Sequence, residues 1–463
     1  MKAMEGGFLS LESKEILTRL EGMHNSLLLE KEEAWRLKSR AIWLESGDDN
    51  TKNFHAYARG RMVANTIWSL RDEEGTSYVS FEEKASCGVT HFQQLFKAPA
   101  QASIAEIIQL AQMFPRFVDE EGNEELLKAV TEEELKVVWG SFQKDKSPGP
   151  DGWTIDFFMA LFDILGMDLL QVLEESRSSG WIPASFNTTF IALIPKADNA
   201  ITLNDFRPIS LCNCVYKIIS KVIAGRLKSI LSEHISAEQF GFLEGRQIHE
   251  AVGVAQEGLH SLKTRRMKGA ILKIDLSKAY DRVSWIYLRL LLTHLGFGIN
   301  FIRWVMSCIT SVSFSVLING AASSFFHAER GLRQGCPLSP LLFLLVAEGL
   351  SRALRGARAD GRFTGIQIAP NLNITHLLFV DDVLIFCSGS KGESKVLKEI
   401  LDLFSKATGM EINAGKSSLT THMLRPKEES ELLRLFPFSS AGLEVGLKYL
   451  GFSLKANNYR KQD

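Results

Sequence analysis

The chain has 463 residues, 45% of them hydrophobic, so it is long enough for more than one domain and can bury a large core. Its 53 basic and 54 acidic residues nearly balance, and net charge therefore does not mark it as a nucleic-acid-binding protein. The charges are unevenly placed, because residues 101–140 carry 9 acidic and 3 basic side chains whereas 201–270 carry 6 and 10, so the central third could face a polyanion.

No stretch approaches the roughly 18 uncharged apolar residues of a membrane span, and the N-terminus has no apolar signal core. We therefore expect neither secretion nor membrane insertion, and an intracellular location in the nucleus or the cytoplasm. The six cysteines show no paired CxxC spacing, and Cys212-x-Cys214 lacks a second pair. This pattern favours reduced structural thiols over a metal site.

The first part of the chain, to about residue 70, is rich in helix formers with apolar residues at roughly helical spacing. Basic and aromatic side chains alternate in it: Trp35, Arg36, Lys38, Arg40, Trp43, Lys52, Phe54, His55, Arg59 and Arg61. Such interleaving suits phosphate contacts combined with base stacking, and an amphipathic helix with a solvated charged face fits the pattern equally well. Residues 71–130 are turn-rich and acidic, and we expect a loosely packed connector there.

Helix and loop signals follow in the next segment. Thr131 and Glu134 form a capping box that predicts a helix start. The sequence KDKSPGPDGW over 144–153 cannot continue a helix and predicts a rigid basic loop, with a second helix over about 155–176.

The strand FIALIPK is expected over 190–196, and a further helix over 216–231. Lys196 ends the strand, and Arg207 stands directly before Pro208. At the ends of neighbouring elements these two cations could grip a triphosphate, the arginine bidentately and the lysine as a point charge. Each of them alone could equally be a surface charge.

A buried strand that runs into a helix is predicted over 269–285, with Asp275 at the end of the strand. Asp275 could bind a ligand there, or it could be a helix N-cap. The later segment 331–350 reads as a glycine-bounded loop, then Ser339 as N-cap and Pro340 at the first helical position. Backbone exposed at Gly335 would let a flat ligand approach closely.

Two adjacent carboxylates, Asp381 and Asp382, separate the apolar runs of residues 377–380 and 383–386. The turn contains no glycine, although two-residue hairpin turns favour residues that accept a positive φ. Adjacent anions beside apolar strands repel and raise each other's pKa unless a cation neutralises them, and a divalent ion such as Mg²⁺ takes carboxylate oxygens. The alternative is a solvated turn whose aspartates face water.

From about residue 33 onward the sequence resembles the reverse transcriptases of non-LTR (LINE-type) retrotransposons, and more narrowly those of plants. The resemblance is carried by motifs in the family's order: WRLKSRAIWLESGDDNTKNFH, KSPGPDGW, FIALIPK, FRPISL, QFGFLEGRQ, KIDLSKAYD, GLRQGCPLSP, FVDD, FSKATGMEINAGKS and KYLGF. Two positions depart from the pattern. Asn53 stands where a second phenylalanine is usual, and Val380 stands where alanine is more frequent, beside the expected primer strand.

The resemblance implies an α+β fold: a right-hand polymerase palm, in which an antiparallel sheet carries three aspartates with helices behind it, joined to helical fingers and an N-terminal helical extension. The expected domains are 1–130 for the extension, 131–250 for the fingers and 251–463 for the palm with its primer-grip segment, with the reverse transcriptase domain over about 185–455. The thumb and a preceding endonuclease are expected to be absent, so that this piece of an element would polymerise weakly.

The implied activity is RNA-directed DNA synthesis from an RNA template, a DNA primer and deoxynucleoside triphosphates, with two Mg²⁺ ions, or alternatively Mn²⁺, about 4 Å apart. The alternative is a decayed remnant that at most binds nucleic acid. By resemblance the metal ligands are Asp275, Asp381 and Asp382, assisted by the carbonyl of Leu276. Tyr280 would exclude a ribose 2′-hydroxyl.

The remaining roles implied by the resemblance concern the nucleotide and the primer. Lys196 and Arg207 would bind the triphosphate, and Gln334 with Gly335 would position the template and the nascent base pair. Lys416 would assist the departure of pyrophosphate. The segment 449–452 would support the primer end.

Overall fold

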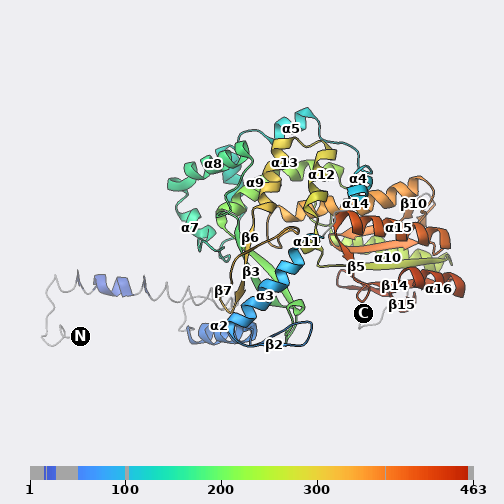
Figure 1. Ribbon diagram of the computed structural model, residues 1–463, viewed down its shortest axis with the longest axis horizontal. Helices are drawn as coiled ribbons and strands as arrows, with labels where there is room; N and C mark the ends of the chain where they lie inside the picture. Colours follow the sequence, from blue (N-terminus) through green and yellow to red (C-terminus); the bar gives the residue numbers. More distant parts are fainter. Residues whose placement is uncertain are drawn as a thin grey trace. The chain divides into compact units, whose positions relative to one another are not determined.

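The computed structural model describes residues 51–99, 104–370 and 372–456, together with 15–16, 18–24 and 26–27 (Figure 1). The chain divides into two compact units. The first consists of Met1–Lys84, Leu193–Arg207 and Ile318–Ala321, and the second of Ala85–Ala192, Pro208–Leu317 and Ala322–Asp463. The alternating basic and aromatic residues 35–43 lie outside the described part. Among the described helices, none combines the length and the hydropathy that a membrane crossing requires.

The first unit contains helix α2 (Thr51–Asn65) and a hairpin of strands β1 (Leu70–Arg71) and β2 (Ser77–Tyr78). The hairpin turn is closed by the Asp72 carboxylate, which accepts hydrogen bonds from the backbone N–H groups of Glu74 and Thr76 at 3.0 and 2.8 Å. The ammonium of Lys84 is buried and donates to the Ile67 carbonyl at 3.0 Å. These polar contacts support a hairpin whose strands are only two residues long.

Residues 71–130 form more than a connector, so the expectation of loose packing is wrong. They include helices α3 (Phe81–Phe96), α4 (Ile104–Ala111) and α5 (Glu120–Leu126). In α4, Ile107 and Leu110 are fully buried, because the helix packs against α12 (Trp285–Leu295) and α15 (Lys391–Thr408). An apolar stripe on a helix this short is stabilised by its partners rather than by its own propensity.

Helix α6 (Glu132–Gly140) begins as predicted, because the Thr131 hydroxyl accepts from the Glu134 N–H at 3.1 Å. The Glu134 carboxylate does not complete the capping box, since it pairs with Arg226 at 2.7 Å. The helix expected over 155–176 is two helices, α7 (Ile155–Ala160) and α8 (Phe162–Ser179), separated at Leu161. Helix α9 (Cys214–His234) contains the predicted 216–231 segment and is longer at both ends.

The second unit is built around a central sheet with the strand order β11-β12-β5-β14-β15, in which β13 also pairs with β5. Its strands are β5 (Gly269–Ser277), β11 (His376–Phe379), β12 (Asp382–Cys387), β13 (Glu411–Ile412), β14 (Ser418–His422) and β15 (Ser439–Gly442). Neighbours are antiparallel except β14 and β15. The strands β5 and β12 are almost wholly buried, as expected for a sheet covered on both faces.

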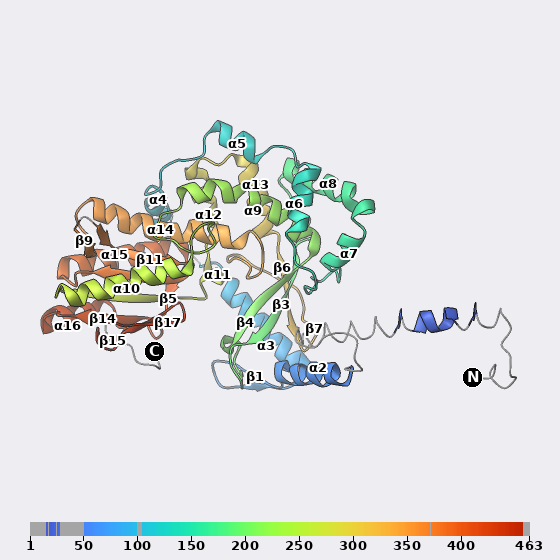
Figure 2. The same cartoon turned by 180° about the vertical axis from the view of Figure 1, so that it is seen from behind.

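Alternate residues of these strands enter two different cores. Leu272, Ile274, Val383 and Ile385 pack with helices α14 (Ser339–Ala359) and α15, whereas Ile271, Leu384 and Phe386 pack with helix α10 (Ile248–Thr264). The α14–α15 face is turned toward the viewer in Figure 1, and α10 crosses the opposite face in Figure 2. This period of two decides which face each polar side chain of the strands joins.

A second sheet has the order β4-β3-β6-β7, with β8 paired to β6. Its strands are β3 (Thr188–Pro195), β4 (Phe206–Cys212), β6 (Ser313–Ile318), β7 (Ala321–Ala322) and β8 (Phe326–His327). The remaining elements are η1 (Leu203–Asp205), α11 (Ala279–Arg282), α13 (Ile299–Thr310), β9 (Ile366–Ala369), β10 (Leu372–Ile374), α16 (Pro426–Leu435), β16 (Leu447–Tyr449) and β17 (Phe452–Leu454).

Helix α14 begins at Ser339 with Pro340 in its first turn, and Leu338 is its N-cap. The predicted cap at Ser339 is therefore displaced by one residue, within the usual spread of helix ends. Buried cysteines 212, 214, 308, 336 and 387 are free thiols.

Candidate active site

Strands β11 and β12 are joined by the two-residue turn Val380-Asp381, because Phe379 pairs directly with Asp382. Val380 has a φ of +60°, and Asp381 does not share this left-handed conformation. A positive φ at the first central residue only is the sign pattern of a type II′ turn, which normally places glycine there. A β-branched residue in this region is strained. Because the turn contains no glycine, Val380 adopts this strained conformation itself.

Asp382 of β12 lies directly opposite Asp275 of β5 in the antiparallel register. Opposed residues of paired strands point to the same face, and their Cβ atoms are about 5 Å apart. The period of two places both side chains on the α10 face of the central sheet, in line with Ile271 and Leu384. Asp275 is not a helix N-cap, because Lys278 caps the next helix, α11.

The three carboxylates affect one another electrostatically. The Asp381 side chain reaches solvent, but surrounding protein removes part of its hydration and raises the pKa of its carboxyl. The charges of Asp382 and Asp275 raise that pKa further. For half-buried Asp382, desolvation is again the largest cause of a raised pKa, the charge of Lys273 lowers it and that of Asp275 raises it. The cluster is thus a site that favours protons or cations.

The chemistry of these donors fits a hard divalent cation, which prefers carboxylate oxygens. Among the described residues, no group of three or more His, Cys, Asp or Glu side chains is arranged to hold a metal ion by itself. Mg²⁺ is commonly held by one or two carboxylates and completed by water and substrate phosphates. A cation at Asp275 and Asp382 would offset the repulsion that raises the pKa of Asp381 and Asp382, with the remaining ligands supplied by a phosphate-bearing substrate.

Strand β5 is secured beside the carboxylates by the turn that precedes β14. The Asp275 N–H donates to the Ser417 hydroxyl at 3.1 Å, and the Asp275 carbonyl accepts from the Asn413 N–H at 2.8 Å. The Lys416 N–H donates to the Asn413 side-chain oxygen at 3.2 Å. These bonds bring the backbone of Lys416, whose side chain is exposed, to the strand that bears Asp275.

Comparison with known proteins decides the family. A family described as reverse transcriptase (RNA-dependent DNA polymerase) matches residues 194–454, more than half of the chain and all three carboxylates. The chain belongs to the reverse transcriptase family.

Its relatives come from mobile elements. The chain is 30% identical, over 99% of its length, to the transposon TX1 uncharacterized 149 kDa protein of Xenopus laevis, of which it covers 35%. It is 26% identical, over 80% of its length, to the Retrovirus-related Pol polyprotein from type-2 retrotransposable element R2DM of Drosophila melanogaster, of which it covers 33%. A third relative is the RNA-directed DNA polymerase from mobile element jockey of Drosophila funebris, 24% identical, with 81% of the chain and 40% of that protein covered.

The chain thus spans about a third of the length of these curated relatives. The resemblance to reverse transcriptases of non-LTR retrotransposons is confirmed. Its narrower assignment to plant elements stays a prediction.

In this reverse transcriptase domain, Tyr280 lies within electrostatic reach of Asp381 in the turn between β11 and β12. Its ring stacks on Phe343 with centroids 4.6 Å apart and planes 5° from parallel. Its carbonyl accepts from the Leu332 N–H at 2.7 Å. Burial raises the pKa of the phenol and the charge of Asp381 raises it further, so the hydroxyl stays protonated at neutral pH. The stacking and the backbone hydrogen bond therefore hold the ring close to Asp381.

The loop that contains Gln334 and Gly335 is anchored through its backbone. The Gln334 carbonyl accepts from the Ser210 N–H at 2.9 Å. Gly335 has a φ of +102°, and a Cβ there would lie 3.1 Å from the Ser210 carbonyl oxygen, so glycine suits both the conformation and the close approach.

The sequence analysis missed the neighbouring Arg333, which is buried. Its guanidinium donates to the Asn187 side-chain oxygen at 2.5 Å, to the Thr189 hydroxyl at 3.0 Å and to the Cys308 carbonyl at 2.7 Å. It also lies 3.9 Å from the centre of the Tyr216 ring. The available signal was a charged residue between Leu332 and Gln334 in the GLRQGC motif, because a charge that becomes buried needs hydrogen-bond partners.

Lys196 and Arg207 belong to the first unit, and their approach to the carboxylates stays a prediction. The Lys196 ammonium donates to the Asn204 carbonyl at 2.7 Å, and its N–H donates to the Asp205 carbonyl at 2.8 Å. Arg207 is exposed on β4. Lys196 directly follows β3 and Arg207 is the second residue of the paired strand β4, so one cation is tied to the backbone and the other faces solvent.

The segment 449–452 is a hairpin of β16 and β17 with Tyr449 opposite Phe452. Leu450 and Gly451 have φ values of 50° and 85°, the pattern of a type I′ turn. Tyr449 is fully buried in the α10-face core with Leu384 and Phe386, and its hydroxyl has no hydrogen-bond partner within the described part of the chain. Burial and the charge of Asp382 raise the pKa of Tyr449.

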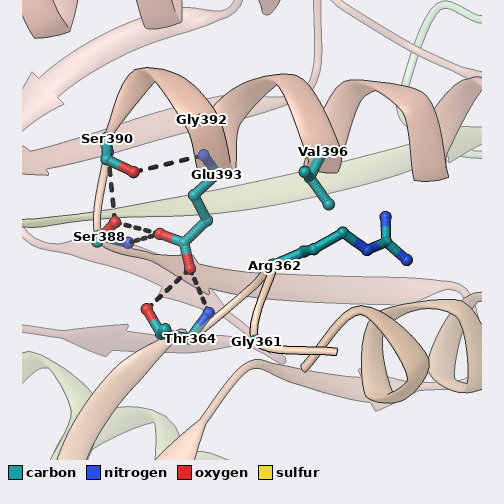
Figure 3. Close-up of a pocket in the computed structure, with 8 residues that line it drawn as sticks. All are labelled: Gly361, Arg362, Thr364, Ser388, Ser390, Gly392, Glu393 and Val396. Carbon is teal, nitrogen blue, oxygen red and sulfur yellow. Dashed lines mark hydrogen bonds between the residues drawn. The ribbon is translucent and has the colours of Figure 1, made fainter. Parts of the chain in front are cut away.

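A separate polar cluster lies beyond the other end of β12, around Glu393 (Figure 3). Its carboxylate accepts from the N–H groups of Thr364, Gly365 and Ser388 at 2.6, 3.0 and 2.5 Å, and from the hydroxyls of Thr364 and Ser388. The adjoining hollow, about 350 Å³, is lined by Gly361, Arg362, Thr364, Ser388, Ser390, Gly392, Glu393 and Val396. Because the Glu393 carboxylate already accepts hydrogen bonds from five donors of the chain, we interpret this cluster as structural: it fixes the segments around Thr364 and Ser388 to the start of α15.

Proposed function

We propose that this reverse transcriptase domain catalyses RNA-templated DNA synthesis, in which a primer 3′-hydroxyl attacks the α-phosphate of a deoxynucleoside triphosphate and releases pyrophosphate. The observation that supports this most strongly is the pairing of Asp275 with Asp382 across two antiparallel strands, with Asp381 in the adjoining turn. Strands of one sheet hold carboxylates at a separation that the transfer of a phosphoryl group requires.

Asp275, Asp381 and Asp382 would hold two divalent ions, Mg²⁺ or alternatively Mn²⁺, and the carbonyl of Leu276 would assist. When bound, such ions stabilise charge on the attacking and leaving oxygens. Lys196, Arg207 and Lys416 would supply positive charge that neutralises the phosphates of the substrate. Gln334 and Gly335 would orient the nascent base pair. The stacked Tyr280 ring would clash with a ribose 2′-hydroxyl.

In this proposal the central sheet is the palm of a right-hand polymerase and residues 131–250 belong to the fingers. The hairpin of β16 and β17 supports the primer end from the α10 face. The nucleic-acid partners are an RNA template and a DNA primer, and the place of action is the nucleus or the cytoplasm.

The test is primer extension on an RNA template by the purified chain, with Mg²⁺, with Mn²⁺ and with a chelator. Synthesis should require the divalent ion, and Asp275→Asn and Asp382→Asn should each reduce it by at least a hundredfold, whereas Glu393→Gln should retain the activity per folded molecule. Metal-independent synthesis, or full activity of Asp275→Asn, would refute the assignment. Tight binding of the template–primer without any synthesis would support the alternative of a remnant that only binds nucleic acid.

A further inference from the structure

The loop 235–246, which contains the QFGF motif, runs along strand β11 next to the catalytic turn. The Leu378 N–H donates to the Glu238 carbonyl at 2.8 Å, and the Leu378 carbonyl accepts from the Phe240 N–H at 2.8 Å. Gln239 is therefore paired in parallel with Leu378, two residues before Val380. This pairing places the Gln239 side chain at the beginning of the turn.

The side-chain amide of Gln239 makes contact with that turn. Its carbonyl oxygen accepts from the Val380 N–H and from the Gly241 N–H, each at 3.0 Å. Because both neighbours are donors, the amide has to present its oxygen to them. Gln239 is only 1% exposed, and its NH₂ group is buried without a hydrogen-bond partner in the described structure. A buried NH₂ group without a partner is energetically unfavourable, so the presence of an amide here indicates that its oxygen has a specific role.

The loop itself is rigidly attached to the unit. Arg246 donates to the Ser236 and Gln239 carbonyls, each at 2.5 Å. The Ser236 hydroxyl and N–H donate to the buried carboxylate of Glu348 in α14, at 2.5 and 3.1 Å. The Gln239 amide is therefore fixed through its backbone to the long central helix rather than to a mobile loop.

The turn needs such support because Val380 is left-handed and β-branched, a conformation that costs of the order of 1–3 kcal/mol and persists only when its surroundings impose it. The Val380 side chain is buried against Gly241, where an added Cβ would lie 2.5 Å from Cγ2 of the valine. Gly241 thus permits the close approach, and Gln239 satisfies the N–H that the strained residue turns inward.

We propose that Gln239 is a positioning residue that holds Val380 in its left-handed conformation and thereby sets Asp381 and Asp382 against Asp275. Its catalytic consequence rests on the proposed function. Displacement of the turn moves two of the three carboxylates together, which changes the metal requirement and the turnover number before it changes template–primer binding.

The first test is Gln239→Met, which keeps the length of the side chain but removes the acceptor. The matched control is Glu393→Gln, which alters a buried acceptor beyond the opposite end of β12. Amide hydrogen exchange of the 376–386 peptide, followed by mass spectrometry, should become about tenfold faster at the turn in Gln239→Met, the effect of one lost hydrogen bond. The control should leave exchange at the turn unchanged. Unchanged exchange in Gln239→Met would overturn the proposal whether or not the chain polymerises.

The second test is primer extension with a Mg²⁺ titration. Gln239→Met should lower kcat at least tenfold and raise the half-saturating Mg²⁺ concentration, with KM for the template–primer within twofold of the parent chain. The unfolding midpoint should fall, because the buried N–H groups of Val380 and Gly241 lose their acceptor, so kcat is expressed per folded molecule. A loss of kcat matched by an equal loss of folded protein would reduce Gln239 to an ordinary structural residue.

The third test is rescue. Glycine adopts the left-handed conformation without strain, so Val380→Gly should make the amide less necessary. The double variant Gln239→Met/Val380→Gly should then reach a kcat within about threefold of Val380→Gly alone. If Gln239→Met lowers kcat by the same factor in the Val380→Gly background as in the parent chain, the amide does not act through Val380. If the parent chain synthesises no DNA, the proposed function is refuted. The hydrogen-exchange measurement then decides by itself whether Gln239 positions the turn.

Discussion

Replacement of Arg333 by methionine provides a quantitative test of how the Gln334–Gly335 loop is held. The variant keeps the length of the side chain and removes three hydrogen bonds and the contact with the Tyr216 ring. Two of the three acceptors keep another interaction. The Cys308 carbonyl still accepts from the Asn187 NH₂ group at 2.9 Å, and the Thr189 hydroxyl still donates to the Asn187 carbonyl at 3.3 Å.

The Asn187 side-chain oxygen alone loses its partner. An orphaned buried acceptor costs about 1–3 kcal/mol, and a desolvated cation–π contact contributes about 2 kcal/mol. Removal of a buried charge returns part of this loss, because its desolvation penalty also disappears. We therefore expect Arg333→Met to lower the free energy of unfolding by about 3 kcal/mol.

The assay is urea denaturation followed by circular dichroism, with Asn187→Leu and the double variant completing a thermodynamic cycle. The double variant should be less destabilised than the sum of the single variants by about 1–2 kcal/mol, because the orphaned oxygen is then absent. Arg333→Lys should remain destabilised, since one ammonium cannot reproduce the two-pronged geometry of the guanidinium. A change below about 0.5 kcal/mol in Arg333→Met, or additive losses in the cycle, would refute the reasoning.

Three further predictions concern Asp382, His376 and Tyr449. Without divalent ions, Asp382→Asn should raise the thermal unfolding midpoint at neutral pH. The native Asp382 carboxyl has a raised pKa, so the stability of the parent chain falls as pH rises above the ordinary value of 3.8. The difference in midpoint between the variant and the parent should vanish below that pH or when Mg²⁺ is added. Burial lowers the pKa of His376 to about 4, so the unfolded state binds the proton at a higher pH than the native state does, and stability should be lost as pH falls from 6.5 toward 4. In a pH series of unfolding midpoints, His376→Gln should weaken this dependence on pH, and an unchanged dependence would contradict the lowered pKa. Tyr449→Phe removes an unpartnered buried hydroxyl and should leave the free energy of unfolding unchanged or raise it by up to about 1 kcal/mol in urea titrations, whereas a loss of more than 1 kcal/mol would reveal a partner.

Features that depend on neighbouring residues were predictable from the sequence. The Thr131 cap, the strand that bears Asp275 and the apolar strands around Asp381 and Asp382 all formed where the local pattern placed them. Each depends on a short-range cause: a side-chain oxygen that reaches an N–H three residues on, or an apolar run long enough for a buried strand. The ordered motifs likewise indicated the family without any structural information.

Tertiary structure alone decided what depends on distant partners. The register that sets Asp382 against Asp275 joins residues more than 100 positions apart, and no local pattern specifies it. Helix α4 was missed because its short apolar stripe is stabilised by α12 and α15 rather than by its own propensity. The left-handed Val380 contradicts local preference, and its contacts with the Gln239 amide and the bare backbone of Gly241 come from a distant segment of the chain. Local preferences amount to a few tenths of a kcal/mol per residue, whereas buried contacts and hydrogen bonds each contribute about 1 kcal/mol or more, so the assembled fold prevails wherever the two conflict.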